Sequence, residues 1–381
     1  MPEPDRFTAG LGISGAQKDL LDGKLPMFNF LQRLSLRRLC KMASATLGRT
    51  PESDGVINEL VADAPTLAVV IPTMLNSKPP VPMSAQERFA MTASCQDAAG
   101  IPKVRDAGLI LDLGDRKVQC MHEGSLVVAG GYHGEWMSRI IGELRGHHEP
   151  QEELLFHEIL KHVAENSCIV ELGAFWAYYT NWYLGSVEGS TAVCVEPDTS
   201  NMSCGQLNLA LNHRTATWIN AAVGSGGKEV LIKRESDGSE VMVPCLNMDE
   251  IRERAGFPVI EVLHLDVQGA ELDLLRSLDN AVAAQALRFV FVSTHHASIS
   301  GSPTTHQDCI RELQRLGAII LEDHSVEESF SGDGLVVASF RMEDAGIQLP
   351  PVSRNTARNS LFGDNLMPAG LAENDNGAAL F

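Results

Sequence analysis

The chain has few positive charges and no early apolar run long enough to cross a membrane. Its 381 residues include 30 Lys and Arg against 49 Asp and Glu, which gives a net charge of −19. A surface of this sign repels nucleic acids and anionic membranes, so we expect no nucleic-acid partner. The most apolar early segment, residues 66–75, is too short to span a bilayer. The first residues, MPEPDRFTAG, also lack the basic-then-apolar order of a secretory signal.

Paired cysteines are missing as well. The eight cysteines are scattered along the chain, none forms a CxxC pair, and several lie inside apolar runs. A thiol in such a run behaves as a small apolar side chain. We therefore predict that the cysteines are reduced and that the protein is cytoplasmic.

The first hundred residues carry the weakest structural pattern. Residues 27–42 have the periodicity of an amphipathic helix, with several basic side chains away from the apolar face. Such a helix packs on the main domain or on a partner subunit, and the alternative is membrane-surface contact through its basic face. Residues 76–82, NSKPPVP, are interpreted as a linker, because paired prolines continue neither a helix nor a central strand. We therefore treat residues 1–100 as a partly helical extension.

Three short strand patterns follow this extension. They lie at residues 108–113, 117–121 and 125–129, with turn residues between them. They predict a small antiparallel meander within residues 101–150, which we interpret as a lid over the substrate. Residues 343–381 end in a segment rich in Asn, Ala, Gly and Pro, which predicts a partly ordered tail. The main domain is therefore expected within residues 151–342.

The main domain alternates between helix and strand patterns. Helix patterns lie at residues 151–163, 269–278 and 303–317. The apolar runs that predict strands lie at residues 169–172, 192–195, 217–223, 259–265, 287–292, 318–321 and 335–340. This alternation predicts a mostly parallel sheet with helices on both faces, an α/β fold of the Rossmann-like type. An extra pair of runs, at 229–233 and 241–244, predicts a hairpin after the third strand.

The first two of these strands end in acids. Glu171 lies at the end of the first strand with Gly173 just after it, and Glu196 follows the second strand. In a nucleoside-binding βαβ unit the second acid accepts hydrogen bonds from both ribose hydroxyls, and we assign this role to Glu196. We expect Glu171 to accept hydrogen bonds from an amino group of the ligand. Gly173 and Ala174 are expected to let the backbone approach the ligand, because a larger side chain would block it.

The loop after the first strand carries no GxGxxG phosphate fingerprint. Residues 174–177 are Ala, Phe, Trp and Ala. Their identity argues against a pyrophosphate-containing cofactor, whereas a nucleoside without phosphate tolerates this loop. The alternative is a tight strand-to-helix turn with aromatic packing. Asn220 and Ala221 follow in the third strand and are expected beside an adenine ring, although Ala–Ala–Val is also an ordinary core sequence.

An acid and two histidines end the next two strands. Asp266 lies where open α/β sheets bind their ligands, and its alternative role is the N-cap of the helix near Gly269. A histidine such as His295 or His296 suits the removal of a proton from a hydroxyl group of a substrate. We assign His295, His296 and Asp266 to catalysis, and Asp266 also to cofactor binding. A metal site built from the two histidines, His306 and a carboxylate matches no standard zinc spacing, and we assign no metal site.

Together these segments resemble the FkbM family of class I methyltransferases. The matching pieces, in order between residues 167 and 340, are VELGAFWAYYT, VCVEPD, INAAVG, VPCLNMDEI, HLDVQGAELDLLRSL, FVSTHH and SFSGDGLVVAS. The resemblance implies a seven-stranded sheet with one reversed strand, and S-adenosylmethionine as the methyl donor. Two places depart from the family pattern. Gln268 stands where an acid is common, which argues against a metal-assisted mechanism, and residues 175–177 stand where glycines are common.

The resemblance implies an S-adenosylmethionine-dependent O-methyltransferase. Its partner would be a small-molecule acceptor, a sugar or another metabolite with a free hydroxyl. Two alternatives stay open. One is a non-catalytic scaffold that keeps the methyltransferase fold. The other is a NAD-dependent oxidoreductase, against which the missing dinucleotide fingerprint argues.

Overall fold

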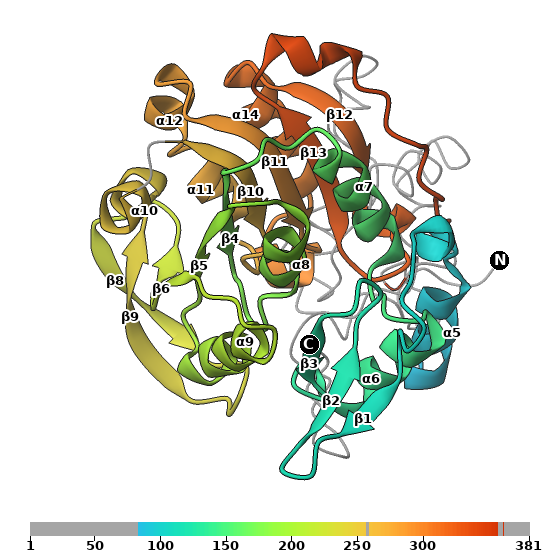
Figure 1. The fold of residues 1–381 in the computed structure, drawn as a ribbon. Coiled ribbons are helices and arrows are strands. Elements are labelled where there is room, and N and C mark those ends of the chain that lie inside the picture. Colours follow the sequence, from blue (N-terminus) through green and yellow to red (C-terminus); the bar gives the residue numbers. More distant parts are fainter. Residues whose placement is uncertain (1–82, 257–258, 357–360, 362–381) are drawn as a thin grey trace, which may run out of the picture. The chain divides into compact units, whose positions relative to one another are not determined.

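The computed structural model in Figure 1 describes residues 83–256, 259–356 and 361. The interpretations of residues 27–42 and 76–82, and most of the predicted tail, lie outside the described residues. The described residues fall within one compact unit.

A seven-stranded sheet forms the centre of this unit (Figure 1). Its strands, in spatial order, are β12 (Ile319–His324), β13 (Gly334–Ser339), β11 (Leu287–Thr294), β10 (Ile260–Leu265), β4 (Cys168–Leu172), β5 (Thr191–Val195) and β6 (Thr217–Ile219). Strands β11, β10, β4, β5 and β6 run parallel to one another, and β13 runs antiparallel to both of its neighbours. The prediction of a Rossmann-like, mostly parallel sheet with one reversed strand is confirmed.

Alternate residues of the central strands bury themselves on opposite faces of the sheet. Val170 of β4 and Leu263 of β10 belong to one core cluster, and Ile169 and Val262 belong to another. The first cluster includes residues of α10 (Met248–Ala255), α11 (Glu271–Leu275), α12 (Asp279–Ala283) and α14 (Thr305–Arg315). The second includes residues of α6 (Gly134–Glu143), α7 (Pro150–Leu160) and α8 (Tyr178–Ser186). Helices therefore cover both faces, which explains why these strands are continuous apolar runs.

The prediction of one continuous third strand is wrong. Residues 217–223 divide into β6, which joins the main sheet, and β7 (Ala222–Val223), which joins a separate three-stranded sheet. The division falls beside Asn220, whose side-chain amide donates to the backbone carbonyls of Glu196 and Pro197 at 2.9 Å each. The second sheet has the order β7-β9-β8. It contains the predicted hairpin, formed by β8 (Lys228–Lys233) and β9 (Glu240–Leu246).

The antiparallel meander before the main sheet is also present. It consists of β1 (Ile110–Asp112), β2 (Lys117–Cys120) and β3 (Leu126–Val128). Strand β3 is held by two asparagines, Asn208 in α9 (Thr199–Leu211) and Asn212 at the C-cap of that helix. Their side-chain oxygens accept hydrogen bonds from the backbone N–H groups of Val128 and Leu126, respectively, each at 2.8 Å. The meander is therefore fixed to the main domain by side chains that satisfy an otherwise open strand edge.

The remaining elements are short. They are α5 (Ala85–Ser94), η2 (Asp97–Gly100), α13 (Ala297–Ser300), η3 (Val326–Glu328) and η4 (Met342–Gly346). Within the described part of the chain, no helix has the length and apolar character needed to cross a membrane. The seven cysteines of that part are free thiols, and all but Cys204 are buried.

Candidate functional site

A cavity of about 530 Å³ opens beside the carboxyl ends of β4, β5 and β10. Its volume suits a small-molecule ligand. Of the residues assigned to a site from the sequence, those that line it are Glu171, Gly173, Ala174, Glu196, Ala221 and Asp266. Asn220, His295 and His296 are not among its lining residues. The parallel strands thus bring the predicted acids of three different strands to one opening.

At Gly173 the backbone after β4 passes very close to the backbone of Asp266. The φ of Gly173 is +75°, and a Cβ atom there would lie 1.6 Å from the carbonyl oxygen of Asp266. Only glycine fits this crossing of the β4 and β10 ends. The carboxylate of Glu171, just before it, accepts the backbone N–H of Thr180 at 3.0 Å, and burial raises the pKa of Glu171. The loop and the start of α8 are therefore fixed around the first acid.

Glu196 presents an oriented carboxylate to the cavity. Its Oε2 accepts the backbone N–H of Phe175 at 3.0 Å, and its Oε1 accepts that of Asp198 at 2.8 Å. Burial raises the pKa of Glu196 to about 7, against the opposing effect of these hydrogen bonds. Each carboxylate oxygen has a second lone pair, so the group keeps acceptor capacity for a ligand. Asn220 lies next to it, is exposed, and donates its side-chain amide to the backbone carbonyls of Glu196 and Pro197.

One wall of the cavity is aromatic. Tyr132 stacks on Trp176 with ring centroids 4.5 Å apart and an interplanar angle of 4°, and it meets Phe175 edge-on at 5.1 Å. The aromatic packing that the alternative interpretation gave to residues 174–177 is therefore present, and Tyr132 is a partner that the sequence analysis did not name. It comes from the turn after β3, within the segment that we interpret as a lid, but no local pattern indicated that Tyr132 itself meets Trp176.

Another part of the wall is polar and contains residues that sequence reasoning missed. His264 Nε2 lies 2.6 Å from Glu152 Oε1, and the hydroxyl of Tyr179 donates to Glu149 at 3.1 Å. Burial lowers the pKa of His148, but the neighbouring carboxylates, above all Glu149, outweigh it and raise this pKa to about 10. The run HHEPQEE was the available signal, because acids and histidines are concentrated there just before an apolar helix face.

Asp266 is backed by a buried histidine. His295 Nε2 lies 3.2 Å from Asp266 Oδ1, and His295 Nδ1 lies 2.6 Å from Glu271 Oε1. The carboxylate of Asp333, also missed from the sequence, lies 3.7 Å from the same Nε2. Burial lowers the pKa of His295, but the charges of Asp333 and Glu271 and the hydrogen bonds outweigh it and raise this pKa well above its usual range.

The protonated His295 in turn keeps Asp266 ionised. Burial raises the pKa of Asp266, but the ion-pair contact with His295 outweighs it and lowers this pKa. The alternative N-cap role of Asp266 is wrong: α11 follows Ala270 without a side-chain cap, and Glu271 accepts the backbone N–H of Gly269 at 2.9 Å. Asp266 is thus a charged acceptor facing the cavity.

The other two histidines near this strand end have separate partners. His296 caps α13, with its Nδ1 accepting the backbone N–H of Ser298 at 3.1 Å. His306 contacts Thr294 at 2.8 Å and Asp323 at 3.4 Å. Among the described residues, His295, His296 and His306 are not brought together as a metal-ligand set. Asp266 and His295 thus contact each other, whereas His296 caps a separate helix.

Comparison with known proteins gives a family match for the main domain. Residues 162–320 match the family model described as the methyltransferase FkbM domain. A precorrin-6y C5,15-methyltransferase from Geobacter metallireducens aligns with 10% identity over 50% of this chain and 87% of its own, with a TM-score of 0.33. Fibrillarin from Aeropyrum pernix, solved with bound S-adenosylmethionine, aligns with 14% identity over 46% and 67%, with a TM-score of 0.30. No curated protein matches the chain. The fold assignment rests on the strand order and the family match.

Proposed function

Because residues 162–320 form a domain of the FkbM methyltransferase family, we propose that the chain methylates a hydroxyl group of a sugar or small metabolite with S-adenosylmethionine. The observation that carries this proposal is the cavity lined by Glu171, Glu196 and Asp266 at the carboxyl ends of β4, β5 and β10. Three acids around one opening complement a ligand that carries an ammonium and a sulfonium group.

The residues present fit this cofactor. Glu196 has acceptor lone pairs for the two ribose hydroxyls, and Glu171 is placed for the amino group of the methionine part. Ala221, with Gly173 and Ala174, leaves space where an adenine or the ligand backbone would lie. The loop offers no glycine-rich phosphate cradle, which agrees with a cofactor that lacks a pyrophosphate. When bound, S-adenosylmethionine supplies an electrophilic methyl group on sulfur.

Asp266 is proposed to accept the proton of the acceptor hydroxyl. An alcohol oxygen that forms a bond to carbon becomes strongly acidic, so a carboxylate with a low pKa is a sufficient base at that stage. His295 holds the carboxylate in place through Nε2 at 3.2 Å and is itself held by Glu271. The stacked Tyr132 and Trp176 offer an apolar face for a ring of the acceptor. Positioning of the hydroxyl then supplies the remaining rate acceleration.

Calorimetric titration with S-adenosylhomocysteine tests the cofactor assignment. We expect wild type to bind it, and Glu196→Gln to bind more weakly by roughly 10- to 150-fold, since a hydrogen bond to a charged group contributes about 1.5–3 kcal/mol. Glu229→Gln, at an exposed position of β8, is the matched control and should bind like wild type. A folded wild type that binds neither S-adenosylmethionine nor its product contradicts the proposal and favours the scaffold. Stabilisation by NAD alone would favour an oxidoreductase.

Cofactor binding should also depend on pH through Glu196. Its pKa in the folded chain is raised to about 7, mainly by burial, so the carboxyl is largely protonated below that pH. A protonated carboxyl is the poorer acceptor for two hydroxyls. Affinity for S-adenosylhomocysteine should therefore rise as pH increases through about 7 and then level off. Titrations across this range should show the same rise in Glu229→Gln and a flatter curve in Glu196→Gln. Affinity that falls through this interval in wild type would contradict the assignment.

The acceptor can be sought by following S-adenosylhomocysteine release with a panel of hydroxyl compounds. Sugars and other small metabolites should stimulate release in wild type. Amines and thiols of similar size serve as the comparison set. Release stimulated only by amines or thiols would show methyl transfer to a different atom and would overturn the O-methyl assignment while leaving the cofactor assignment in place.

A further inference from the structure

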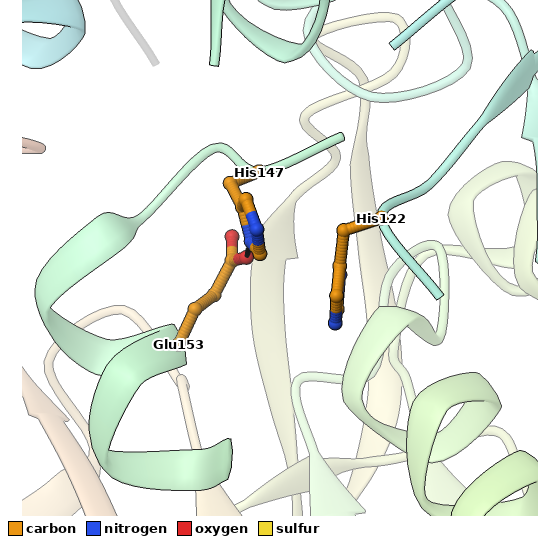
Figure 2. A group of neighbouring side chains, drawn as sticks. All are labelled: His122, His147 and Glu153. Atoms are coloured by element: carbon orange, nitrogen blue, oxygen red, sulfur yellow. Dashed lines mark hydrogen bonds and ion pairs between the residues drawn. The ribbon is translucent and has the colours of Figure 1, made fainter. Parts of the chain in front are cut away.

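A second group of titratable side chains lies outside the cavity described above. His122 follows β2, His147 lies in the loop between α6 and α7, and Glu153 lies in α7 (Figure 2). Their exposed fractions are 1%, 1% and 0%. Each residue offers one atom that could bind a metal ion, and these three atoms lie within 4.8 Å of one another. Two imidazoles and a carboxylate from three separate segments thus converge in the interior.

The contacts within this cluster are close. Nδ1 of His147 contacts Oε2 of Glu153, and Figure 2 shows the rings of His122 and His147 facing each other. Those rings stack with centroids 4.3 Å apart. The hydroxyl of Tyr178 donates to Glu153 at 3.0 Å and lies 3.2 Å from His122 Nδ1.

Two polar groups in the cluster have no hydrogen-bond partner. His147 Nε2 and both carboxylate oxygens of Glu123 are buried and unpaired. Glu123 lies beside the cluster, with its Oε2 3.4 Å from His122 Nδ1. Buried polar atoms in native proteins are nearly always paired, because an unpaired one loses its hydration without compensation. The cluster therefore has ligand atoms that no hydrogen bond occupies.

We propose that His122, His147 and Glu153, with Glu123 beside them, bind a divalent transition-metal ion, and zinc in particular. Imidazole nitrogens combined with carboxylate oxygens suit zinc, whereas magnesium and calcium take oxygen ligands almost alone. A metal approaches an imidazole in the plane of its ring, so the stacked rings turn toward the ion when it binds. His122 and Glu123 also line a second cavity of about 450 Å³, which offers a path of entry.

The ion would clamp three segments together. It would join the turn after β2, the loop that carries His147, and the first turns of α7. The next residues, His148 and Glu149, line the cofactor cavity. Loading should therefore stabilise the chain and order that wall of the cavity. This site does not depend on the methyl-transfer proposal, because it lies on different side chains.

Metal titration of the purified chain, carrying no affinity tag, tests the proposal. After treatment with a chelator, wild type should bind one zinc ion per chain, and its Tm should rise on loading. Cobalt in place of zinc should give the visible absorption of a tetrahedral site. His122→Ala and His147→Ala should each lose stoichiometric binding. His162→Ala is the control, because His162 is exposed just after α7 and lines neither cavity, and it should bind like wild type.

Three outcomes would overturn the site. A folded wild type that binds no ion would leave the cluster as a hydrogen-bond network, and so would binding that persists in both histidine variants. If both variants fail to fold, X-ray absorption of zinc-loaded wild type decides. Two imidazole ligands support the site, and fewer than two exclude it. Binding of S-adenosylhomocysteine, measured on the same samples, is a separate readout, so failure of the metal site leaves the proposed function intact.

Discussion

Replacement of Asp266 by asparagine should lower kcat by roughly 10²-fold or more, the range seen when a general base is removed. The amide keeps the shape of the side chain but removes the charge that accepts the hydroxyl proton. Affinity for S-adenosylhomocysteine should fall far less than kcat, because Glu171 and Glu196 still line the cavity. Steady-state kinetics with the identified acceptor, combined with calorimetry, measures both quantities.

Two further variants make this prediction specific. His295→Gln removes the cation that lowers the pKa of Asp266, so the acid limb of the kcat/KM profile should move to higher pH. Asp279→Asn alters an exposed carboxylate paired with Arg315 at 3.0 Å and should leave the profile unchanged. A wild-type kcat in Asp266→Asn would show that Asp266 takes no part in the chemical step. If the acid limb of the kcat/KM profile does not shift in His295→Gln, His295 contributes only to packing.

Gly173→Ala should abolish folding or reduce the free energy of unfolding by more than about 3 kcal/mol, beyond the range of most single substitutions. The added methyl group would meet the carbonyl oxygen of Asp266 at 1.6 Å, and the backbone φ of +75° is itself unfavourable for alanine. Both crossing segments are strand ends in the main sheet, so neither can shift without breaking the sheet. Denaturant unfolding followed by circular dichroism measures the loss.

Gly114→Ala separates the clash from the backbone strain. Gly114 has a similar φ of +91°, but no atom lies within 4 Å of the position that a Cβ would take there. The substitution should therefore cost only about 1–2 kcal/mol, the expected strain of a left-handed residue with a side chain. Equal losses in the two variants would show that the close approach of Gly173 to Asp266 contributes nothing.

Much of the main sheet could be predicted from its local pattern. The apolar runs of β4, β5, β10 and β11 were recognisable because strands buried on both faces have few polar positions. The same pattern located Glu171, Glu196 and Asp266, since the carboxyl ends of parallel strands meet at one edge. The divided strand at residues 217–223 was missed, because an apolar run does not show where its pairing partner changes.

The roles of the histidines could be predicted only in part. His295 and His296 are adjacent in the chain, and both follow a buried strand. Successive side chains at a strand end point in different directions, so one reaches Glu271 and Asp266 while the other caps a short helix. The sequence therefore located His295 and His296, but only the backbone direction after β11 decided which of them contacts Asp266.

The sequence by itself therefore determined the alternation of strands and helices, the order of the acids and the absence of a phosphate loop, because each depends on residues close together in the chain. Only the tertiary structure decided which distant side chains meet. Tyr132 on Trp176, Asp333 near His295, and the cluster of His122, His147 and Glu153 all join segments that are far apart in the chain or belong to different elements. Their protonation follows from burial and neighbouring charge, which exist only once those segments have packed.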